Sequence, residues 1–245
     1  MSDSTENKDF REGRLLLIDK PLEWTSFDVV NKVKRTLNYK LPKSERIKVG
    51  HAGTLDPLAT GLLIVATGKF TKKLHQLQGL DKSYSGSIKL GATTPSYDCE
   101  TEENEHYSTE HLTVKEILSA AQSLTGSIQQ VPPLYSAVRI DGERAYKKAR
   151  RQENDKLPDP RNVIIHAFDI ICNDFNNITF NVNCSKGTYI RSLAFDFGQK
   201  LNNGAYLTSL RRTSIGDFNI ENASNLEEIV EELKAYNNEC LSRLG

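Results

Sequence analysis

Residues 50–61, GHAGTLDPLATG, constrain the fold of this chain more than any other segment. Asp56 stands between Leu55 and Pro57, and proline restricts the backbone of the residue before it to extended geometry. Glycines at both ends of the segment allow tight turns or a close approach of another backbone. The apolar run 62–66 that follows predicts a buried strand. The segment therefore predicts a turn that presents one carboxylate, although an ordinary surface loop leading into a core strand would have the same composition.

The periodicity of apolar residues predicts a mixture of helices and strands. Helices follow an apolar stripe or begin at a cap, such as Thr25-Ser26 or the capping boxes that start at Thr113 and Ser224. The predicted helices span 26–38, 69–80, 113–124 and 188–201, with an acidic helix after 224; the predicted strands span 14–18, 62–66, 83–90, 163–172 and 178–184. Because no regular βαβ period occurs, we expect an α+β fold with a mixed, mainly antiparallel central sheet flanked by helices and loops.

The chain shows no sign of export, of a membrane span or of a metal site. Its N-terminus is polar, and no apolar run approaches the ~20 residues that cross a bilayer. The four cysteines are far apart in sequence and form no CxxC pair, which favours reduced thiols, and the five histidines show no metal-ligand spacing. We therefore expect a cytoplasmic protein without a metal ion, and we expect residues 1–12 to be disordered.

Charge is balanced overall but segregated along the chain. There are 32 basic and 32 acidic residues, yet segment 31–48 holds seven basic residues and one acid, and segment 139–151 holds six basic residues and two acids. Each run is either a solvated surface or a basic face for a polyanion. Segment 130–161 adds four prolines, Tyr135 and Tyr146, which fits either a nucleic-acid surface or a mobile, solvated insertion.

The common catalytic motifs are absent. Gly68-Lys69 lacks the spacing of a phosphate-binding loop, and no nucleophile elbow surrounds a serine. A hydrolase with paired carboxylates would need a second acid beside Asp56. Asp28, Asp81 and Asp98 are candidates that nothing in the sequence distinguishes.

Several segments in the same order resemble the TruB family of pseudouridine synthases, which isomerise a uridine in the T-loop of transfer RNA. The matching segments are GHAGTLDPLATG, DKP at 19–21, DKSY at 81–84, VPPLYSA at 131–137, CSKGTYIR at 184–191 and LRR at 210–212. The resemblance covers roughly residues 14–218. It implies a pseudouridine synthase catalytic domain over 13–220 with an RNA-clamping insertion at about 130–161. Residues 221–245 would then form a short acidic helix, without the RNA-binding PUA domain that many relatives carry.

The resemblance also implies a role for individual residues. Asp56 would be the catalytic carboxylate, Arg191 would pair with it, and Tyr84 would stack on the uracil. The residues expected to bind substrate or to support the pocket are His51, Lys20, Tyr189 and Leu210.

The reaction only moves a bond within the nucleotide, so no cofactor is expected. The expected partner is the T-arm of tRNA, with no role for DNA or a membrane, and the protein is expected to be a monomer. Two alternatives on the same scaffold are a guide-dependent enzyme and a non-catalytic RNA-folding factor.

Overall fold

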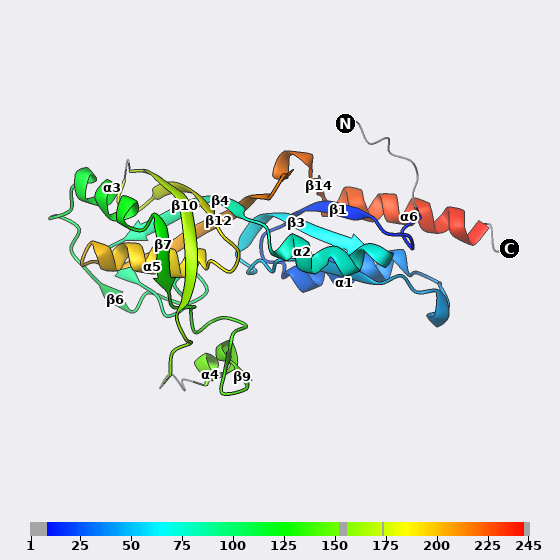
Figure 1. The fold of residues 1–245 in the computed structure, drawn as a ribbon, viewed down its shortest axis with the longest axis horizontal. Helices are drawn as coiled ribbons and strands as arrows, with labels where there is room; N and C mark the ends of the chain where they lie inside the picture. The colour runs from blue at the N-terminus through cyan, green and yellow to red at the C-terminus, as the bar shows by residue number, and fades with distance from the viewer. Residues whose placement is uncertain (1–8, 152–155, 173, 243–245) are drawn as a thin grey trace. The chain divides into compact units, whose positions relative to one another are not determined.

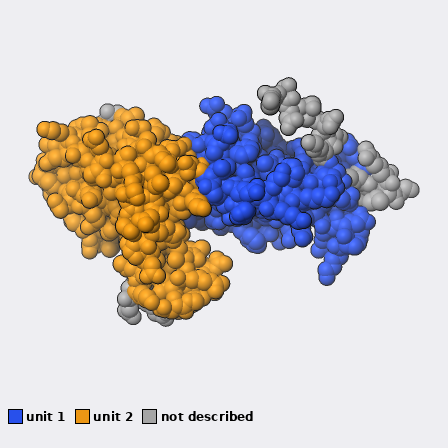
Figure 2. All heavy atoms as spheres, viewed as in Figure 1, with its two compact units in different colours: residues 1–80, 211–245 blue, residues 81–210 orange. Residues whose placement is uncertain are grey.

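The computed structural model describes residues 9–151, 156–172 and 174–242 (Figure 1). The chain divides into two compact units (Figure 2). Unit 1 combines residues 1–80 with 211–245, and unit 2 is the continuous stretch 81–210. Each unit has its own layer of strands with helices packed on it, so each can be described from its own contacts.

Unit 1 is built around β3 (Ala59–Thr67), the strand that leaves the Asp56 turn. β1 (Leu15–Lys20) and β2 (Val49–Ala52) pair with it in antiparallel fashion, and β12 (Ala205–Ile215) is its other neighbour in the strand order. β14 (Ser224–Asn225) pairs in parallel with β1, and β13 (Phe218–Asn219) pairs with the end of β12.

The helices of unit 1 cover these strands. They are α1 (Ser26–Leu37), α2 (Leu74–Gln78) and α6 (Leu226–Ser242), with the 3-10 turns η1 (Lys43–Glu45), η2 (Gly68–Lys73) and η3 (Ile220–Asn222). β1 alternates partly buried and buried residues, and its buried Leu16 and Ile18 pack with Val33 of α1 and Leu233 of α6 in one apolar cluster. α1 begins with the predicted cap, since Thr25 and Asp28 form a complete capping box.

Unit 2 contains four antiparallel strands in the order β4-β11-β10-β7, and β12 is next to β4 in the strand order. These strands are β4 (Lys82–Leu90), β11 (Ile178–Cys184), β10 (Arg161–Ile171) and β7 (Gly126–Gln130). Two longer helices, α3 (Val114–Ser123) and α5 (Ile190–Lys200), complete the unit. Its smaller elements are β5 (Ala92–Thr93), β6 (Glu105–His106), β8 (Arg139–Ile140), β9 (Glu143–Arg144) and α4 (Ala145–Arg150).

The structure confirms the α+β class with mainly antiparallel strands and corrects several predicted elements. The helix predicted over 69–80 is a 3-10 turn followed by the short α2, and β6 lies within residues 98–110, where no strand was predicted. β2, β7 and β12 were not predicted. β12 contains a buried arginine, Arg212, at 1% exposure. Its inward face therefore lacks the apolar pattern that predicts a strand.

Both chain ends also differ from the sequence predictions. Residues 9–12 form a turn in which Phe10 is buried, so they do not belong to the expected tail, whose residues 1–8 lie outside the described part of the chain. The C-terminal helix begins one residue later than predicted, because Asn225 and Glu228, not Ser224 and Glu227, exchange the capping bonds. Among the described residues, no helix is long and apolar enough to cross a membrane.

Candidate active site

The turn that carries Asp56 is held by hydrogen bonds on its own backbone. The buried hydroxyl of Ser26, at the start of α1, accepts a bond from the Leu55 N–H at 2.8 Å and donates to the Leu55 carbonyl at 3.2 Å. The carbonyl of Asp56 accepts from the Ala59 N–H at 3.1 Å, and that of Pro57 accepts from the Glu23 N–H at 2.9 Å. The half-buried carboxylate therefore extends from a backbone that is tied at four points.

Lys20 supports the same turn from the end of β1. Its side chain is completely buried, and its ammonium donates to the carbonyls of Pro21 at 2.8 Å, Trp24 at 2.5 Å and Pro57 at 3.3 Å. Burial lowers the pKa of Lys20 to about 8, although the charge of Asp56 acts in the opposite direction. Lys20 thus joins the segment before α1 to the turn and places a positive charge near Asp56.

Arg212 of β12 is a second buried cation in this region. Its Nε donates to the Leu62 carbonyl at 2.8 Å and its Nη2 donates to the Gly53 carbonyl at 2.9 Å. The two carbonyls flank residues 54–61, so one guanidinium holds both ends of the turn. Gly61, with φ of +99°, permits this approach, because a Cβ there would lie 2.3 Å from the Arg212 carbonyl oxygen.

His51 lies on β2, before the turn. Burial and the charge of Arg212 lower the pKa of His51, and a hydrogen bond with the Gly53 backbone opposes this shift. Among the described residues, none pairs with its buried Nδ1. A buried polar atom without a partner is costly, which marks His51 as a candidate for contact with a ligand.

In unit 2, Arg191 stands at the start of α5 and is 3% exposed. Its guanidinium donates to the carbonyls of Ser96 at 3.1 Å and Tyr135 at 2.9 Å. Its Nε lies 3.5 Å from a carboxylate oxygen of Asp98, which is 6% exposed. Of the three further acids considered in the sequence, Asp98 alone is buried; Asp28 and Asp81 are not.

The segment before α5 is fixed by a glutamine that the sequence did not single out. Gln130, at the end of β7, is completely buried; it accepts from the N–H of Tyr189 at 2.8 Å and donates to its carbonyl at 3.1 Å. The ring of Tyr189 lies 5.1 Å from the guanidinium of Arg161, within the range of a cation–π contact. The hydroxyl of Ser192 donates to the Val131 carbonyl at 2.7 Å. These bonds tie the start of α5 to the segment at 130–135.

Tyr84 and Leu210 lie on strands of unit 2. Tyr84 is 8% exposed on β4, opposite Val182 of β11, and Leu210 is half-buried on β12. β4 and β12 approach closely at Gly86, where a Cβ would lie 2.3 Å from the Ser209 carbonyl oxygen. Glycine at 86 therefore lets the strand of Tyr84 pack against the strand of Leu210.

The predicted site residues divide between the two units. Unit 1 contains Asp56, Lys20 and His51, while Tyr84, Arg191, Tyr189 and Leu210 belong to unit 2. The predicted pair of Asp56 with Arg191 joins the units and stays a prediction. Sequence reasoning missed the roles of Asp98, Gln130 and Arg212. Only Arg212 carried a signal, because it belongs to the LRR segment.

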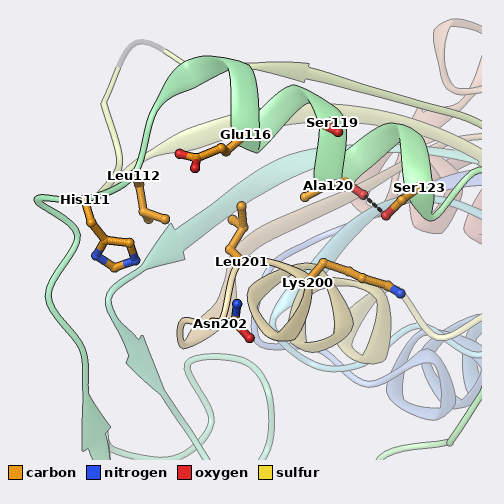
Figure 3. A pocket seen from close by; sticks show the side chains of 9 residues that line it. All are labelled: His111, Leu112, Glu116, Ser119, Ala120, Ser123, Lys200, Leu201 and Asn202. Atoms are coloured by element: carbon orange, nitrogen blue, oxygen red, sulfur yellow. Dashed lines mark hydrogen bonds between the residues drawn. The ribbon is translucent and has the colours of Figure 1, made fainter.

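A pocket of about 410 Å³ in unit 2 lies elsewhere, between α3 and the end of α5 (Figure 3). The residues that line it include the polar His111, Glu116 and Lys200 and the apolar Leu112 and Leu201. None of the predicted site residues lines it. Among the described residues, no three side chains of His, Cys, Asp or Glu gather as a metal site would require.

Two family models match the chain from residue 34 onward. The model described as "TruB family pseudouridylate synthase (N terminal domain)" matches residues 34–190, and the "tRNA pseudouridylate synthase B C-terminal domain" matches residues 191–244. The tRNA pseudouridine synthase B of Flavobacterium johnsoniae is 49% identical over 227 residues, which are 93% of this chain and 99% of that protein. The protein of the same name from Chloroherpeton thalassium is 50% identical over 222 residues, 91% of each chain.

Two solved structures have a fold similar to that of this chain. The crystal structure of a Cbf5-Nop10-Gar1 complex matches with a TM-score of 0.65 and 27% identity, over 91% of this chain and 54% of that chain. The structure of an H/ACA RNP bound to a substrate RNA containing 2'-deoxyuridine matches with a TM-score of 0.66 and 25% identity, over 94% and 56%. The chain therefore spans a little over half the length of these solved chains.

Proposed function

The chain belongs to the TruB family of pseudouridine synthases, and we propose that it converts a uridine to pseudouridine at position 55, in the T-loop of tRNA. The reaction breaks the bond between ribose C1′ and uracil N1 and joins C1′ to C5. The proton of C5 is lost and N1 gains a proton, so the product is an isomer of the substrate. No electrons or groups are exchanged with another molecule, and the chemistry calls for no cofactor.

The turn that carries Asp56 is the observation on which this function rests. A carboxylate that attacks C1′, or that removes a ribose proton on the way to a glycal, must be ionised and precisely aimed. Lys20 and Arg212 tie the backbone of the turn, and the positive charge of Lys20 lies where it attracts the carboxylate of Asp56. Either chemical path is compatible with this arrangement.

The remaining site residues would hold the substrate and complete the pocket. In this proposal the ring of Tyr84 stacks on the uracil, Arg191 pairs with Asp56, and Tyr189 supports them. His51 occupies the space that the flipped nucleotide leaves, and its unpaired Nδ1 is then satisfied by RNA. Leu210 contributes an apolar wall. Extraction of the base from its stack costs a few kcal/mol, which contacts to the RNA must offset.

The proposed partner is the T-arm of tRNA, gripped in part by the insertion at about 130–161. Unstacked bases and 2′-hydroxyls of the loop would provide the recognition, as is usual for RNA loops. We further propose that the protein acts as a monomer in the cytoplasm, where tRNA is modified.

The substitution Asp56→Asn tests the function directly, because it removes the charge and preserves the size of the side chain. We expect it to abolish pseudouridine formation on a T-arm hairpin, measured by loss of tritium from C5-labelled uridine, without changing the Kd for the RNA. Asp217→Asn, at an exposed position of the same unit, is the matched control and should be fully active. Turnover at the normal rate by the Asp56 variant would refute the proposal.

The two alternatives on this scaffold make different predictions. A guide-dependent enzyme would be inactive as a purified chain until guide RNA is added, and a folding factor would be unaffected by Asp56→Asn. The close relatives named tRNA pseudouridine synthase B favour neither alternative. Activity of the purified chain on unmodified tRNA alone would exclude both.

A further inference from the structure

The structure separates two basic segments that look alike in the sequence. In segment 139–151, three of the six basic residues form ion pairs with acidic residues. Arg151 makes a bidentate contact with Glu143 at 2.8 and 2.9 Å. Arg150 lies 3.6 Å from Glu100, and Lys148 lies 3.9 Å from Asp141. Much of the positive charge of this segment is therefore neutralised within the protein.

The connection between α1 and β2, residues 38–48, behaves differently. We call it the basic loop; its cations are Lys40, Lys43, Arg46 and Lys48, and all four are exposed. Within the described parts of the chain, none of these four makes an ion pair with a carboxylate. The loop's one acidic residue, Glu45, forms an ion pair with Arg11 at 3.0 Å.

The basic loop is anchored despite its exposed charge. The side chain of Asn38 accepts from the Ile47 N–H at 2.6 Å and donates to the Ile47 carbonyl at 3.1 Å, which closes the loop at its base. Leu41 and Ile47 are buried at 5% and 4% exposure. In Figure 1 the basic loop is the blue hook that follows the end of α1. The cations are therefore presented on an ordered backbone, which reduces the entropic cost of binding.

Helix stabilisation does not account for these charges. Lys34 and Arg35 lie in the last turn of α1, where positive side chains favourably meet the helix dipole. The four cations of the basic loop follow the end of α1, and Arg46 and Lys48 lie outside any helix. Four exposed like charges on a short anchored segment repel one another unless an anion lies between them.

We propose that the basic loop binds the phosphate backbone of a double-helical stem of the substrate tRNA. The inference rests on the proposed function, because the substrate supplies the polyanion. Lys48 is separated from the Asp56 turn by the four residues of β2, which span about 13 Å at the rise of a strand. In the proposed function the nucleotide under reaction lies at the turn, and a loop this close to the turn would meet the phosphates of the stem that leads to that nucleotide. Such stems are recognised mainly through their backbone and shape.

The double variant Lys43→Gln/Arg46→Gln tests the proposal, since neither side chain makes an ion pair with a carboxylate of the described residues. We expect a several-fold higher Kd for full-length tRNA and an unchanged rate of pseudouridine formation at saturating tRNA. The plot of log Kd against log salt, between about 50 and 200 mM, should become shallower by about 1.5 to 2, because two phosphate contacts are lost. A thermal unfolding curve checks that the fold is intact.

The matched control is Lys115→Gln/Lys200→Gln, which removes the same charge from exposed positions of unit 2. It should keep the wild-type salt dependence. If both double variants change the slope equally, the effect is one of net charge and the proposal is wrong. It is also wrong if the Lys43/Arg46 variant keeps the wild-type slope while it forms pseudouridine normally, a result that would leave the proposed function intact. Failure of the proposed function would appear instead as tRNA binding by the wild-type protein without any pseudouridine.

Discussion

Two neighbouring arginines show how burial decides what a residue contributes. Arg211 is half-exposed and pairs with Asp19 at 2.6 Å, whereas the buried Arg212 donates to two backbone carbonyls on either side of the Asp56 turn. Arg212→Lys keeps the charge and loses the planar fork, which leaves at least one buried carbonyl unpaired. We expect the free energy of unfolding in urea to fall by about 2–4 kcal/mol and kcat to fall more than KM rises.

Arg211→Lys is the control for this prediction. An exposed ion pair contributes about 0–1 kcal/mol, and the substitution preserves the charge. A variant at Arg212 that unfolds at the wild-type urea concentration and retains kcat would show that the turn does not depend on the guanidinium.

At the same scale, the sequence indicates the candidate site residues better than the residues that hold buried partners in place. Asp56 and Lys20 stand in short motifs that can be read directly. Asp98 and Gln130 stand in segments of ordinary polar composition, and each owes its importance to a partner far along the chain: Arg191 for Asp98, and the backbone of Tyr189 for Gln130. Burial of a polar residue against such a partner is a property of the tertiary structure and leaves no local pattern.

At the scale of elements, the cap of α6 gives a test between two adjacent residues. The Asn225 side chain accepts from the Glu228 N–H at 2.9 Å, and the Glu228 carboxylate accepts from the Asn225 N–H at 3.2 Å. Asn225→Ala should therefore lower the free energy of unfolding by about 1 kcal/mol, measured by urea denaturation. Ser224→Ala should change it by less than about 0.5 kcal/mol. If Ser224→Ala lowered the free energy of unfolding more than Asn225→Ala, the helix would be capped at Ser224, as the sequence predicts.

Elements with a regular apolar period were the predictable ones. β4 buries Tyr84, Ile88 and Leu90 as its alternation requires, and the boxes at Thr25 and Thr113 begin α1 and α3 as expected. β12 was not recognised because Arg212 occupies a position that an apolar residue would normally fill. A strand whose inward side chain is a paired cation cannot be recognised by hydrophobic period, because the pairing carbonyls come from other segments.

At the scale of the whole molecule, the chain builds unit 1 from both of its ends. Residues 81–210 form unit 2 between them, so the turn with Asp56 and the helix α6 belong to one unit although about 170 residues separate them. The buried face of α6 supplies Leu226, Ile229, Val230 and Leu233 to the apolar cluster that also contains β1, α1 and β3. The acidic helix at the end of the chain is thus part of the core that supports the site.

This arrangement predicts that a substitution in α6 impairs the reaction without touching the substrate. Leu233 is completely buried, and Leu233→Ala should lower the free energy of unfolding by about 2–5 kcal/mol through lost burial and the cavity left behind. Because β1 carries Lys20 and α1 carries the Ser26 that binds Leu55, activity should decline with temperature in parallel with unfolding of the variant.

The control is Leu118→Ala, at a position of α3 that is 47% exposed, which should change the free energy of unfolding by less than about 0.5 kcal/mol. Pseudouridine formation and circular dichroism measured across the same temperature series provide the check. Full activity of the Leu233 variant at temperatures where its helical signal is lost would show that the Asp56 turn is held independently of α6.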